Sequence, residues 1–312
     1  MAEQLDTPRA LIQWGAERFE RAGLVYAHGT DNALDEAAYL VMRTLNIDYD
    51  QPDRVLDTTI SPADSRRVTD LLEQRLSSRK PAAYLLQEAW FAGLPFYVDE
   101  RVLVPRSPIA ELVESRFGPW IQPDQVHRVL DMCTGSGCIG IACAFAFPDA
   151  LVDLSDISTD ALAVATENIR RHELAERVST IESDVFDALQ DRTYDIIVVN
   201  PPYVPSEEQH TLAPEFGHEP SLGLFAGTEG LDIVIEILCH AGDFLGPHGI
   251  LVVEVGYTQD LLAQRFPGVP FMWFDFEYGG TGVFMLDARQ LREYRSEFEQ
   301  AAAELSQRIK QE

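Results

Sequence analysis

The chain has 312 residues, of which 46% are hydrophobic, and its formal net charge is −27. This length and composition are enough for one large and one small domain, each with a buried core. They exclude a membrane-spanning helix, because no apolar stretch approaches the ~20 residues that such a helix needs. Since residues 1–21 also lack the apolar core of a signal peptide, we expect a cytoplasmic protein.

The acidity limits the partners that the chain can bind. Lysine occurs only as Lys80 and Lys310, and the sequence contains no run of basic residues. Phosphate backbones are bound by dense clusters of lysine and arginine, so direct recognition of nucleic acid is not expected. A strongly negative surface favours a basic partner, although the same charge can serve solubility alone.

Residues 1–86 are expected to form a small helical bundle. Asp6-Thr7-Pro8, Asp31-Asn32 and Ser61-Pro62 are typical of helix starts, and an apolar run at helical spacing follows each of them. Nothing in this segment indicates catalytic chemistry, so it is predicted to dock a substrate. Residues 87–107 are expected to bridge two domains, because the alternating, aromatic-rich run at 91–104 predicts a β-hairpin.

Residues 108–288 are expected to form an α/β domain with a doubly wound, mostly parallel, seven-stranded sheet. Strands and helices alternate from about residue 127, and strands are predicted at 129–133, 151–156, 178–182, 195–200 and 250–255. A glycine-rich segment joins two further strands, at 272–277 and 282–286, so the sheet is expected to end with an antiparallel strand. Residues 289–312 have the pattern of a charged amphipathic helix.

A glycine loop follows the first strand of this sheet. Asp131 and the segment Thr134-Gly135-Ser136-Gly137 lie between that strand and a helix, and the glycines let the backbone approach a ligand closely. Asp156 ends the next strand, where a carboxylate can accept hydrogen bonds from ribose hydroxyls. Asp184 ends the third strand and can accept from an adenine amine, while the apolar pair that begins at Val185 covers the ring.

This loop predicts a site for S-adenosylmethionine. It contains no lysine, so a pyrophosphate would be poorly held, whereas an adenosine with a small zwitterionic arm fits the donors and acceptors better. A simpler alternative is that Asp156 and Asp184 only cap the helices that follow them.

The most informative segment is Asn200-Pro201-Pro202-Tyr203, which directly follows the apolar run at 194–199. The prolines fix φ and remove backbone donors, so the turn is stiff and presents the Asn200 side-chain oxygen and nearby carbonyls as acceptors. Two acceptors can hold a planar NH2 group by both hydrogens, and Tyr203 can stack on that group. The side-chain amide of glutamine and the exocyclic amine of adenine are groups of this kind.

Topology brings the turn and the glycine loop together. In a doubly wound sheet, ligands bind off the carboxyl ends of the strands, where the strand order reverses. A methyl donor on the glycine loop would therefore face an NH2 acceptor on the turn.

The cysteines and histidines do not predict a metal site. Cys133, Cys138 and Cys143 are evenly spaced without a histidine close in sequence, and Cys239 lies in a separate apolar segment. We expect the cysteines to be small buried apolar side chains, and we expect Arg106 to lock the bridge through a carboxylate.

Together, the glycine loop and the turn resemble those of the bacterial protein-glutamine N5-methyltransferases. The similarity extends over the bridge at residues 91–106 and over His218-Glu219-Pro220. Pro105-Arg106-Ser107-Pro108 looks like the branch of this family that modifies a glutamine of ribosomal protein L-three.

The resemblance implies a class I, Rossmann-like methyltransferase in which Asn200 and the Pro201 carbonyl hold the glutamine amide and Tyr203 flanks it. The substrate would be the basic ribosomal protein L-three or a ribosome assembly intermediate, in agreement with the acidity of the chain. The resemblance assigns S-adenosylmethionine to residues at three strand ends and at the turn, namely Asp131, Thr134, Gly135, Ser136, Gly137, Asp156, Asp184, Val185 and Asn200.

Three other functions stay open at this point. A release-factor glutamine methyltransferase shares the same motifs. An adenine-N6 methyltransferase of nucleic acid uses the same turn, but it should bring a basic groove, which the sequence lacks. A non-catalytic ribosome assembly factor could keep the fold, although a pure binder has no use for an intact Asn200-Pro201-Pro202-Tyr203 turn.

Overall fold

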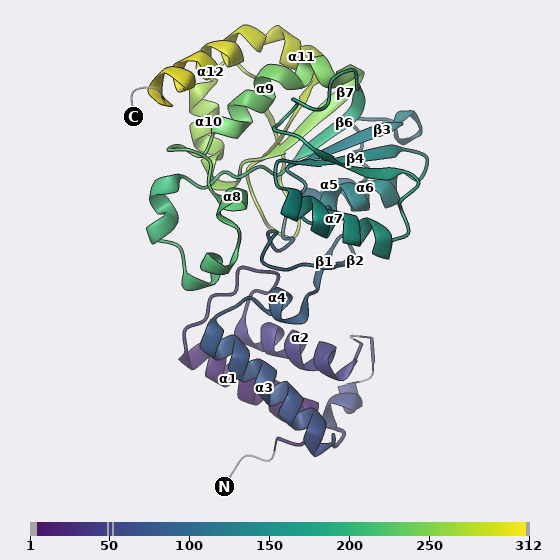
Figure 1. Cartoon of the computed structure of the whole chain (residues 1–312), viewed down its shortest axis with the longest axis vertical. Helices are drawn as coiled ribbons and strands as arrows, with labels where there is room; N and C mark the ends of the chain where they lie inside the picture. The colour runs from purple at the N-terminus through teal and green to yellow at the C-terminus, as the bar shows by residue number, and fades with distance from the viewer. Residues whose placement is uncertain (1–4, 49, 52, 310–312) are drawn as a thin grey trace.

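The computed structural model describes residues 5–48, 50–51 and 53–309 (Figure 1). A helical bundle lies at one end of the molecule and an α/β sheet at the other, with a short hairpin between them. The bundle consists of α1 (Pro8–Arg21), α2 (Ala33–Leu45), α3 (Pro62–Ser78) and the short α4 (Ala82–Leu86).

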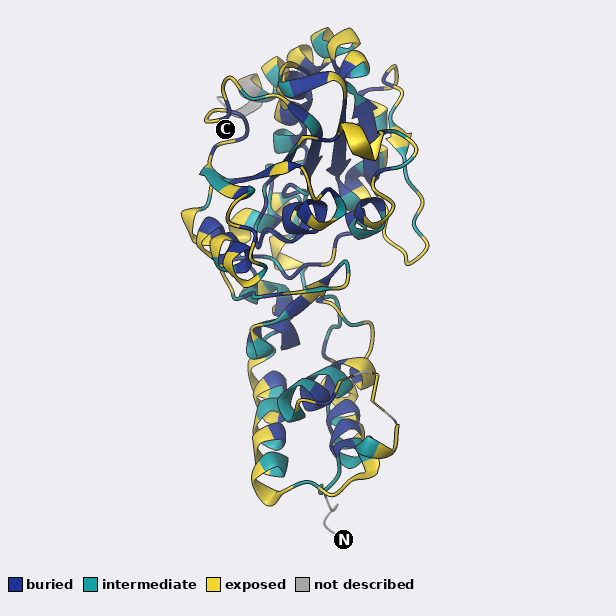
Figure 2. Cartoon of the chain, turned by 90° about the vertical axis from the view of Figure 1, so that its right-hand side faces the viewer, coloured by how far each residue is buried: buried dark blue, intermediate teal, exposed yellow. Residues whose placement is uncertain are grey.

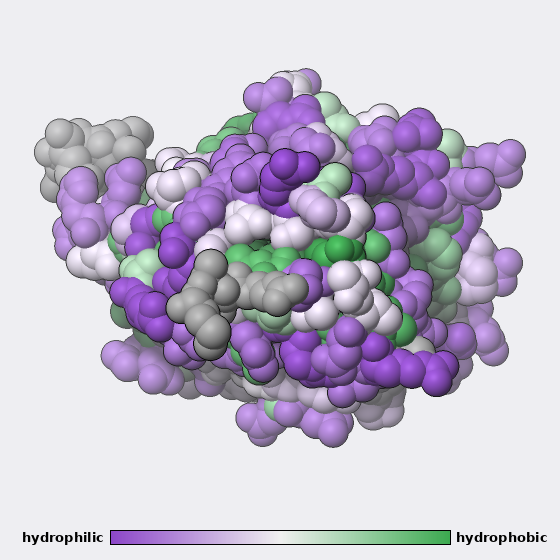
Figure 3. Space-filling model, turned by 90° about the horizontal axis from the view of Figure 1, so that it is seen from below, coloured by the Kyte–Doolittle hydropathy of each residue, from purple (hydrophilic) through white to green (hydrophobic). Residues whose placement is uncertain are grey.

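The bundle helices begin where the sequence predicts. The side chains of Thr7, Asn32 and Ser61 each accept a hydrogen bond from the backbone N–H three residues later, which satisfies a donor at each helix start. The helices pack around fully buried apolar side chains that include Leu11 and Leu72. Figure 3 looks onto the free end of the bundle, where mostly hydrophilic side chains surround a central apolar strip.

The predicted hairpin lies within residues 87–107, but it is shorter than the alternating run at 91–104 and begins before it. Strands β1 (Ala89–Phe91) and β2 (Leu94–Phe96) pair antiparallel around Ala92 and Gly93, which both have positive φ, as the tight turns of two-residue hairpins require. Residues 97–107 form no strand. Their apolar side chains, such as Val98 and Val102, alternate because they pack against Tyr84 and the helix at 159–171.

The sheet contains the seven strands that the sequence predicts, in the order β5-β4-β3-β6-β7-β9-β8. The strands are β3 (Arg128–Met132), β4 (Leu151–Asp156), β5 (Val178–Glu182), β6 (Tyr194–Val199), β7 (Leu245–Glu254), β8 (Met272–Trp273) and β9 (Val283–Asp287). The antiparallel strand β9 lies between β7 and β8 and not at the edge, because it forms a five-residue ladder with β7, whereas β8 pairs with it over two residues.

Helices cover both faces of the sheet. One face carries α5 (Ile109–Glu114), α6 (Cys138–Ala146) and α7 (Thr159–Arg171), and the other carries α9 (Asp232–Phe244), α10 (Gln259–Arg265), α11 (Ala288–Glu293) and α12 (Arg295–Ile309). Val129 and Val198 belong to the first core, while Leu130 and Val199 belong to the second. Both faces of the central strands are therefore buried (Figure 2), as expected for a parallel sheet.

The C-terminal segment differs from the single helix predicted for residues 289–312. It forms α11 and α12 with a break at Tyr294, and Asp287 caps α11 in a reciprocal pair with Gln290. Residues 310–312 lie outside the described residues. Of the helices in the described ranges, none is long and apolar enough to cross a membrane.

A long loop between β6 and α9, residues 200–231, returns to the helical bundle. It contains the short helix α8 (Ser221–Leu224) and the fully buried side chain of Glu215. Glu215 accepts hydrogen bonds from the Val25 backbone N–H at 3.1 Å and pairs with Arg79 at 2.7 Å. Arg75, also buried, lies 3.9 Å from Glu215 and is paired with Glu36 at 2.7 Å. A buried ion cluster thus ties the loop to the bundle.

Replacing Glu215 by Ala should destabilise the protein, because the buried Arg75 loses one of its acidic neighbours. Breaking a buried ion pair by removing one partner costs on the order of 3 kcal/mol or more, so thermal unfolding should begin several degrees lower. Glu207→Ala is the matched control, since Glu207 lies exposed in the same loop. Equal melting temperatures for the two variants would contradict a stabilising role for Glu215.

Candidate active site

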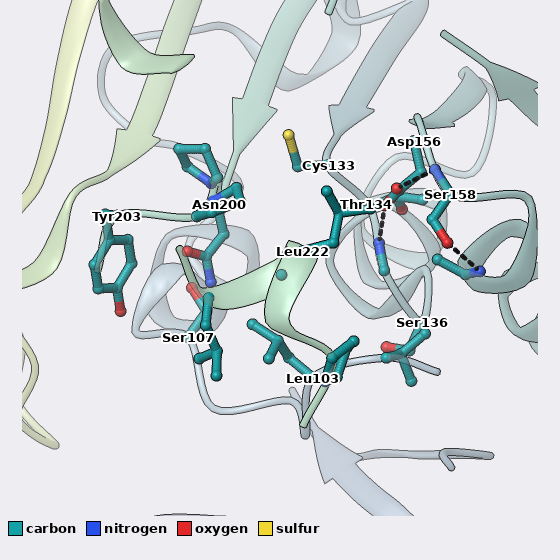
Figure 4. A pocket seen from close by; sticks show the side chains of 18 of the residues that line it. Leu103, Ser107, Cys133, Thr134, Ser136, Asp156, Ser158, Asn200, Tyr203 and Leu222 are labelled. Carbon is teal, nitrogen blue, oxygen red and sulfur yellow. Dashed lines mark hydrogen bonds between the residues drawn. The ribbon is translucent and has the colours of Figure 1, made fainter. Parts of the chain in front are cut away.

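A cavity of about 410 Å³ lies at the carboxyl ends of the central strands. Its walls come from the bridge, the glycine loop, the ends of β4 and β5, the turn after β6, the long loop that follows it, and the end of β7. Figure 4 shows Thr134, Ser136 and Asp156 on one side of the pocket and Asn200 and Tyr203 on the other. From β3 the chain adds β4 and then β5 on one side of the sheet, and it then returns to add β6 on the other side of β3. The cavity therefore lies at the predicted reversal of strand order.

The glycine loop is held by Asp156. One oxygen of this carboxylate accepts from the Gly135 N–H and the other from the Ser158 N–H, both at 2.9 Å. Burial raises the pKa of Asp156 against these two bonds. Asp156 does bind the start of the next helix, as the simpler alternative proposed, but the N-cap of that helix is Ser158. Because each carboxylate oxygen has two lone pairs, Asp156 keeps acceptor capacity toward the cavity that it lines.

Asp131 and Gly137 do not line the cavity but shape the loop from behind. Asp131 is 1% exposed, and its Oδ2 accepts from the Thr134 hydroxyl at 2.6 Å and from the Gly140 N–H at 2.8 Å. Gly137 has φ of +81°, and a Cβ there would lie 3.0 Å from Leu154. These residues fix the conformation that Thr134, Gly135 and Ser136 present to the cavity.

Gly140 is a structural residue of the loop that the sequence reasoning missed. A Cβ at this position would lie 2.2 Å from a methyl group of Leu154 and 2.8 Å from the Asp131 Cβ. Its spacing from Gly135 and Gly137 completes a G-x-G-x-x-G pattern, in which the third glycine serves close helix–strand packing. The pattern was present in the sequence, so this signal was available.

The far end of this side of the pocket carries Asp184 and Val185, which both line the cavity. Asp184 is exposed, and Val185 is buried with φ of +43°. The Ser183 hydroxyl donates to the Val185 carbonyl at 3.0 Å and so holds this unusual backbone. An exposed carboxylate beside an apolar side chain can bind an amine edge and cover a ring.

These groups fit S-adenosylmethionine. A cavity of about 410 Å³ is within the size range of small-molecule sites. Asp156 ends β4 and Asp184 follows the neighbouring β5, where their carboxylates can accept hydrogen bonds from such a ligand. The described part of the chain contains no cluster of His, Cys, Asp and Glu suited to a metal ion.

On the opposite wall, the Asn200 side chain lines the cavity. Asn200 directly follows β6, and none of the described residues forms a hydrogen bond with its side-chain amide. Pro201 and Pro202 are buried and hold the turn, while Asn200 and Tyr203 are partly exposed and line the cavity. The Tyr203 hydroxyl donates to Glu254 Oε1 at 3.1 Å, and burial raises the pKa of Tyr203 well above its usual value.

The loop after the turn is fixed over the pocket by Glu219. This buried carboxylate binds Arg106 Nη2 at 2.8 Å and the Val104 N–H at 3.1 Å, and it lies 3.5 Å from His28 Nε2 of the bundle. Burial alone would raise the pKa of Glu219, but His28 and Arg106 hold it at about 2. The expectation that Arg106 locks the bridge through a carboxylate is confirmed. His218 instead contacts the Ser78 carbonyl in the bundle.

Comparison with known proteins gives one family and a set of close relatives. Residues 119–219 match the family described as "Methyltransferase small domain". The chain is 43% identical over 295 residues to the ribosomal protein uL3 glutamine methyltransferase of Francisella tularensis, a match that covers 94% of each chain. It is 45% identical over 291 residues to the protein of the same name from Neisseria meningitidis serogroup A, covering 93% of this chain and 96% of the relative.

Solved structures are more distant. The catalytic domain of hMettl16 in complex with MAT2A 3'UTR hairpin 6 is 16% identical, with a TM-score of 0.48, covering 73% of this chain and 81% of that one. The Thermus thermophilus 16S rRNA methyltransferase RsmC in complex with AdoMet and guanosine is 18% identical, with a TM-score of 0.44, covering 64% and 49%.

Asp131 should make the stability of the protein depend on pH. Burial raises the pKa of Asp131 to about 7, against the bonds from Thr134 and Gly140 that lower it, whereas an aspartate in an unfolded chain titrates near ~3.9. The unfolded chain therefore loses this proton first, and the stabilisation present below about pH 4 is lost as the pH rises to about 7.

Asp131→Asn should remove this decline. Across that pH window, the free energy of unfolding of the wild type should fall relative to that of the variant by up to about 1.4 kcal/mol for each pH unit. Urea unfolding at several pH values measures it, with the exposed Asp160→Asn as control. Parallel pH curves for the wild type and Asp131→Asn would show that Asp131 does not titrate there.

Proposed function

The chain belongs to the family of ribosomal protein uL3 glutamine methyltransferases, and from this premise we propose that it methylates the side-chain amide nitrogen of a glutamine in uL3, the protein called L-three above. S-adenosylmethionine is the methyl donor. The observation that carries the proposal is the Asn200 amide, which has no hydrogen-bond partner among the described residues and lines the same cavity as Gly135 and Asp156.

In this proposal, the turn acts by holding the amide. An amide nitrogen is a weak nucleophile because its lone pair is delocalised into the carbonyl. The Asn200 side-chain oxygen and the Pro201 carbonyl accept the two N–H hydrogens, which fixes the plane of the amide and returns electron density to its nitrogen. Pro202 keeps the turn rigid, and Tyr203 packs beside the amide.

When bound, S-adenosylmethionine supplies an electrophilic methyl group on a sulfonium. The residues of the chain contribute orientation and charge placement. Gly135, Asp156 and Asp184 hold the cofactor so that its methyl group faces Asn200. The nitrogen releases its proton as the new bond forms, so the proposal needs no strong base to act first, and the turn contains none.

The net charge of the chain supports a basic protein substrate. The net charge of −27 attracts a basic ribosomal protein over about the Debye length of 10 Å. We further propose that residues 1–86 dock this substrate while residues 108–288 carry the chemistry, and that the target is free uL3 or an assembly intermediate in the cytoplasm. The bundle contributes His28 to the polar contacts around Glu219, which places it next to the site.

The function is tested by methyl transfer from labelled S-adenosylmethionine. The chain is incubated separately with uL3, with a peptide release factor and with ribosomal RNA, and the modified residue is mapped by mass spectrometry. Label on a glutamine of uL3 supports the proposal. Label on the release factor or on adenine instead would assign one of the alternative activities.

Replacing Asn200 by Ala should remove most of this turnover. Loss of one positioned partner commonly costs on the order of 100-fold or more in kcat, and S-adenosylmethionine affinity, measured by calorimetry, should stay close to wild type. Gln209→Ala is the matched control, because it removes an exposed side-chain amide from the same loop. A fall in cofactor affinity that equals the fall in turnover would contradict the substrate-holding role.

Replacing Asp156 by Ala should act on cofactor binding instead. The carboxylate holds the glycine loop and faces the ribose site, so its loss should weaken S-adenosylmethionine binding by about 10-fold or more. Asp160→Ala removes an exposed aspartate from the first turn of the following helix and serves as the control. Calorimetry decides the question, and unchanged affinity for Asp156→Ala would exclude the assignment.

A further inference from the structure

The buried carboxylate of Glu254 lies beside the turn but belongs to neither of the two motifs. Glu254 is the last residue of β7, which pairs with β6 so that Val253 lies opposite Val199, the residue before Asn200. Its side chain is 5% exposed and lines the cavity. A charged side chain at this point needs a reason, because strand packing alone is served by an apolar residue.

Glu254 joins three separate segments of the chain. Its Oε1 accepts from the Tyr203 hydroxyl at 3.1 Å, and its Oε2 accepts from the Ser107 hydroxyl. The Ser107 oxygen in turn accepts from the Ile109 N–H at 3.2 Å. The turn after β6, the end of the bridge and the end of β7 are thus held to one carboxylate.

The Tyr203 ring is fixed at a second place by Gly256. A Cβ at this position would lie 2.7 Å from Tyr203 Cε2, and the residue has φ of +51°. The backbone of Gly256 therefore approaches the ring more closely than any other residue type would permit. Contact at the hydroxyl and on the ring together determine both the position and the rotation of Tyr203.

The environment of Glu254 is suited to holding partners. Burial raises the pKa of this carboxyl, while the bonds from Ser107 and Tyr203 and the positive charge of Arg106 lower it. Both oxygens already accept hydrogen bonds from side chains that line the cavity. Through these two bonds, Glu254 fixes two side chains of the cavity wall, Ser107 and Tyr203.

We infer that Glu254 is a positioning residue for methyl transfer, which holds Tyr203 and Ser107 so that the substrate amide is confined between Tyr203 and Asn200. This inference rests on the proposed function. Loss of Glu254 should therefore lower kcat and leave cofactor affinity unchanged. Among the described residues, none in the glycine loop forms a hydrogen bond with Glu254.

Two substitutions of Glu254 separate shape from hydrogen bonding. Glu254→Gln keeps an acceptor for Tyr203 and should lose only a few-fold in kcat, whereas Glu254→Leu removes both bonds and should lose about 100-fold, the cost of a misplaced reacting group. Both variants should bind S-adenosylmethionine with wild-type affinity. Wild-type turnover by Glu254→Leu overturns the inference.

A double-mutant cycle with Tyr203→Phe tests whether Glu254 acts through Tyr203, because a general folding defect of Glu254→Leu would be equal in both backgrounds. The loss caused by Glu254→Leu should shrink in the Tyr203→Phe background, because the bond is already absent there. Full additivity of the two losses overturns the inference. A pH–rate profile that shows a basic group in the wild type but not in Glu254→Gln also overturns it, because Glu254 would then be a proton acceptor. The wild type assayed in parallel on uL3 keeps the two questions apart: no transfer by the wild type rejects the proposed function, whereas transfer by all variants at equal rates rejects only the role of Glu254.

Discussion

The parallel pairing of β3 with β6 is the constraint on which the rest of the site depends. The register places Met132 opposite Val199, so the glycine loop and the turn both leave the sheet at the same level and one strand spacing apart. Neighbouring strands are less than 5 Å apart, which brings two loops separated by more than sixty positions of sequence into one cavity. The long loop and the bridge both line the cavity that lies at these two strand ends.

Buried glutamates organise the segments that have no regular structure. Glu215, Glu219 and Glu254 are all 5% exposed or less, and each binds partners from distant parts of the chain. A buried carboxylate is tolerated only when it is paired and hydrogen-bonded, so each glutamate permits few arrangements of the loops around it. This restriction gives the irregular wall of the pocket a definite shape.

The sequence was sufficient for the features that depend on local patterns. The central parallel strands of the sheet are present as predicted because a buried parallel strand is a short apolar run between turn residues. The turn, the glycine loop and Asp156 were placed together because the topology of such sheets is restricted. Sequence reasoning failed where distant partners decide: Val98 and Val102 alternate like a strand but pack on α7, and β9 takes its place by pairing with β7. Nothing near Glu254 in sequence points to Ser107 or Tyr203.

The attachment of residues 205–224 to the helical bundle has a consequence for how such a protein can be recombined. This stretch is encoded within the α/β part, yet its glutamates bind Val25, His28 and Arg79. A chimera that joins the bundle of one relative to the sheet of another keeps these pairs only where both relatives carry the matching residues. A functional exchange between relatives should therefore move the bundle and residues 205–224 together, although these two parts are separated in the sequence.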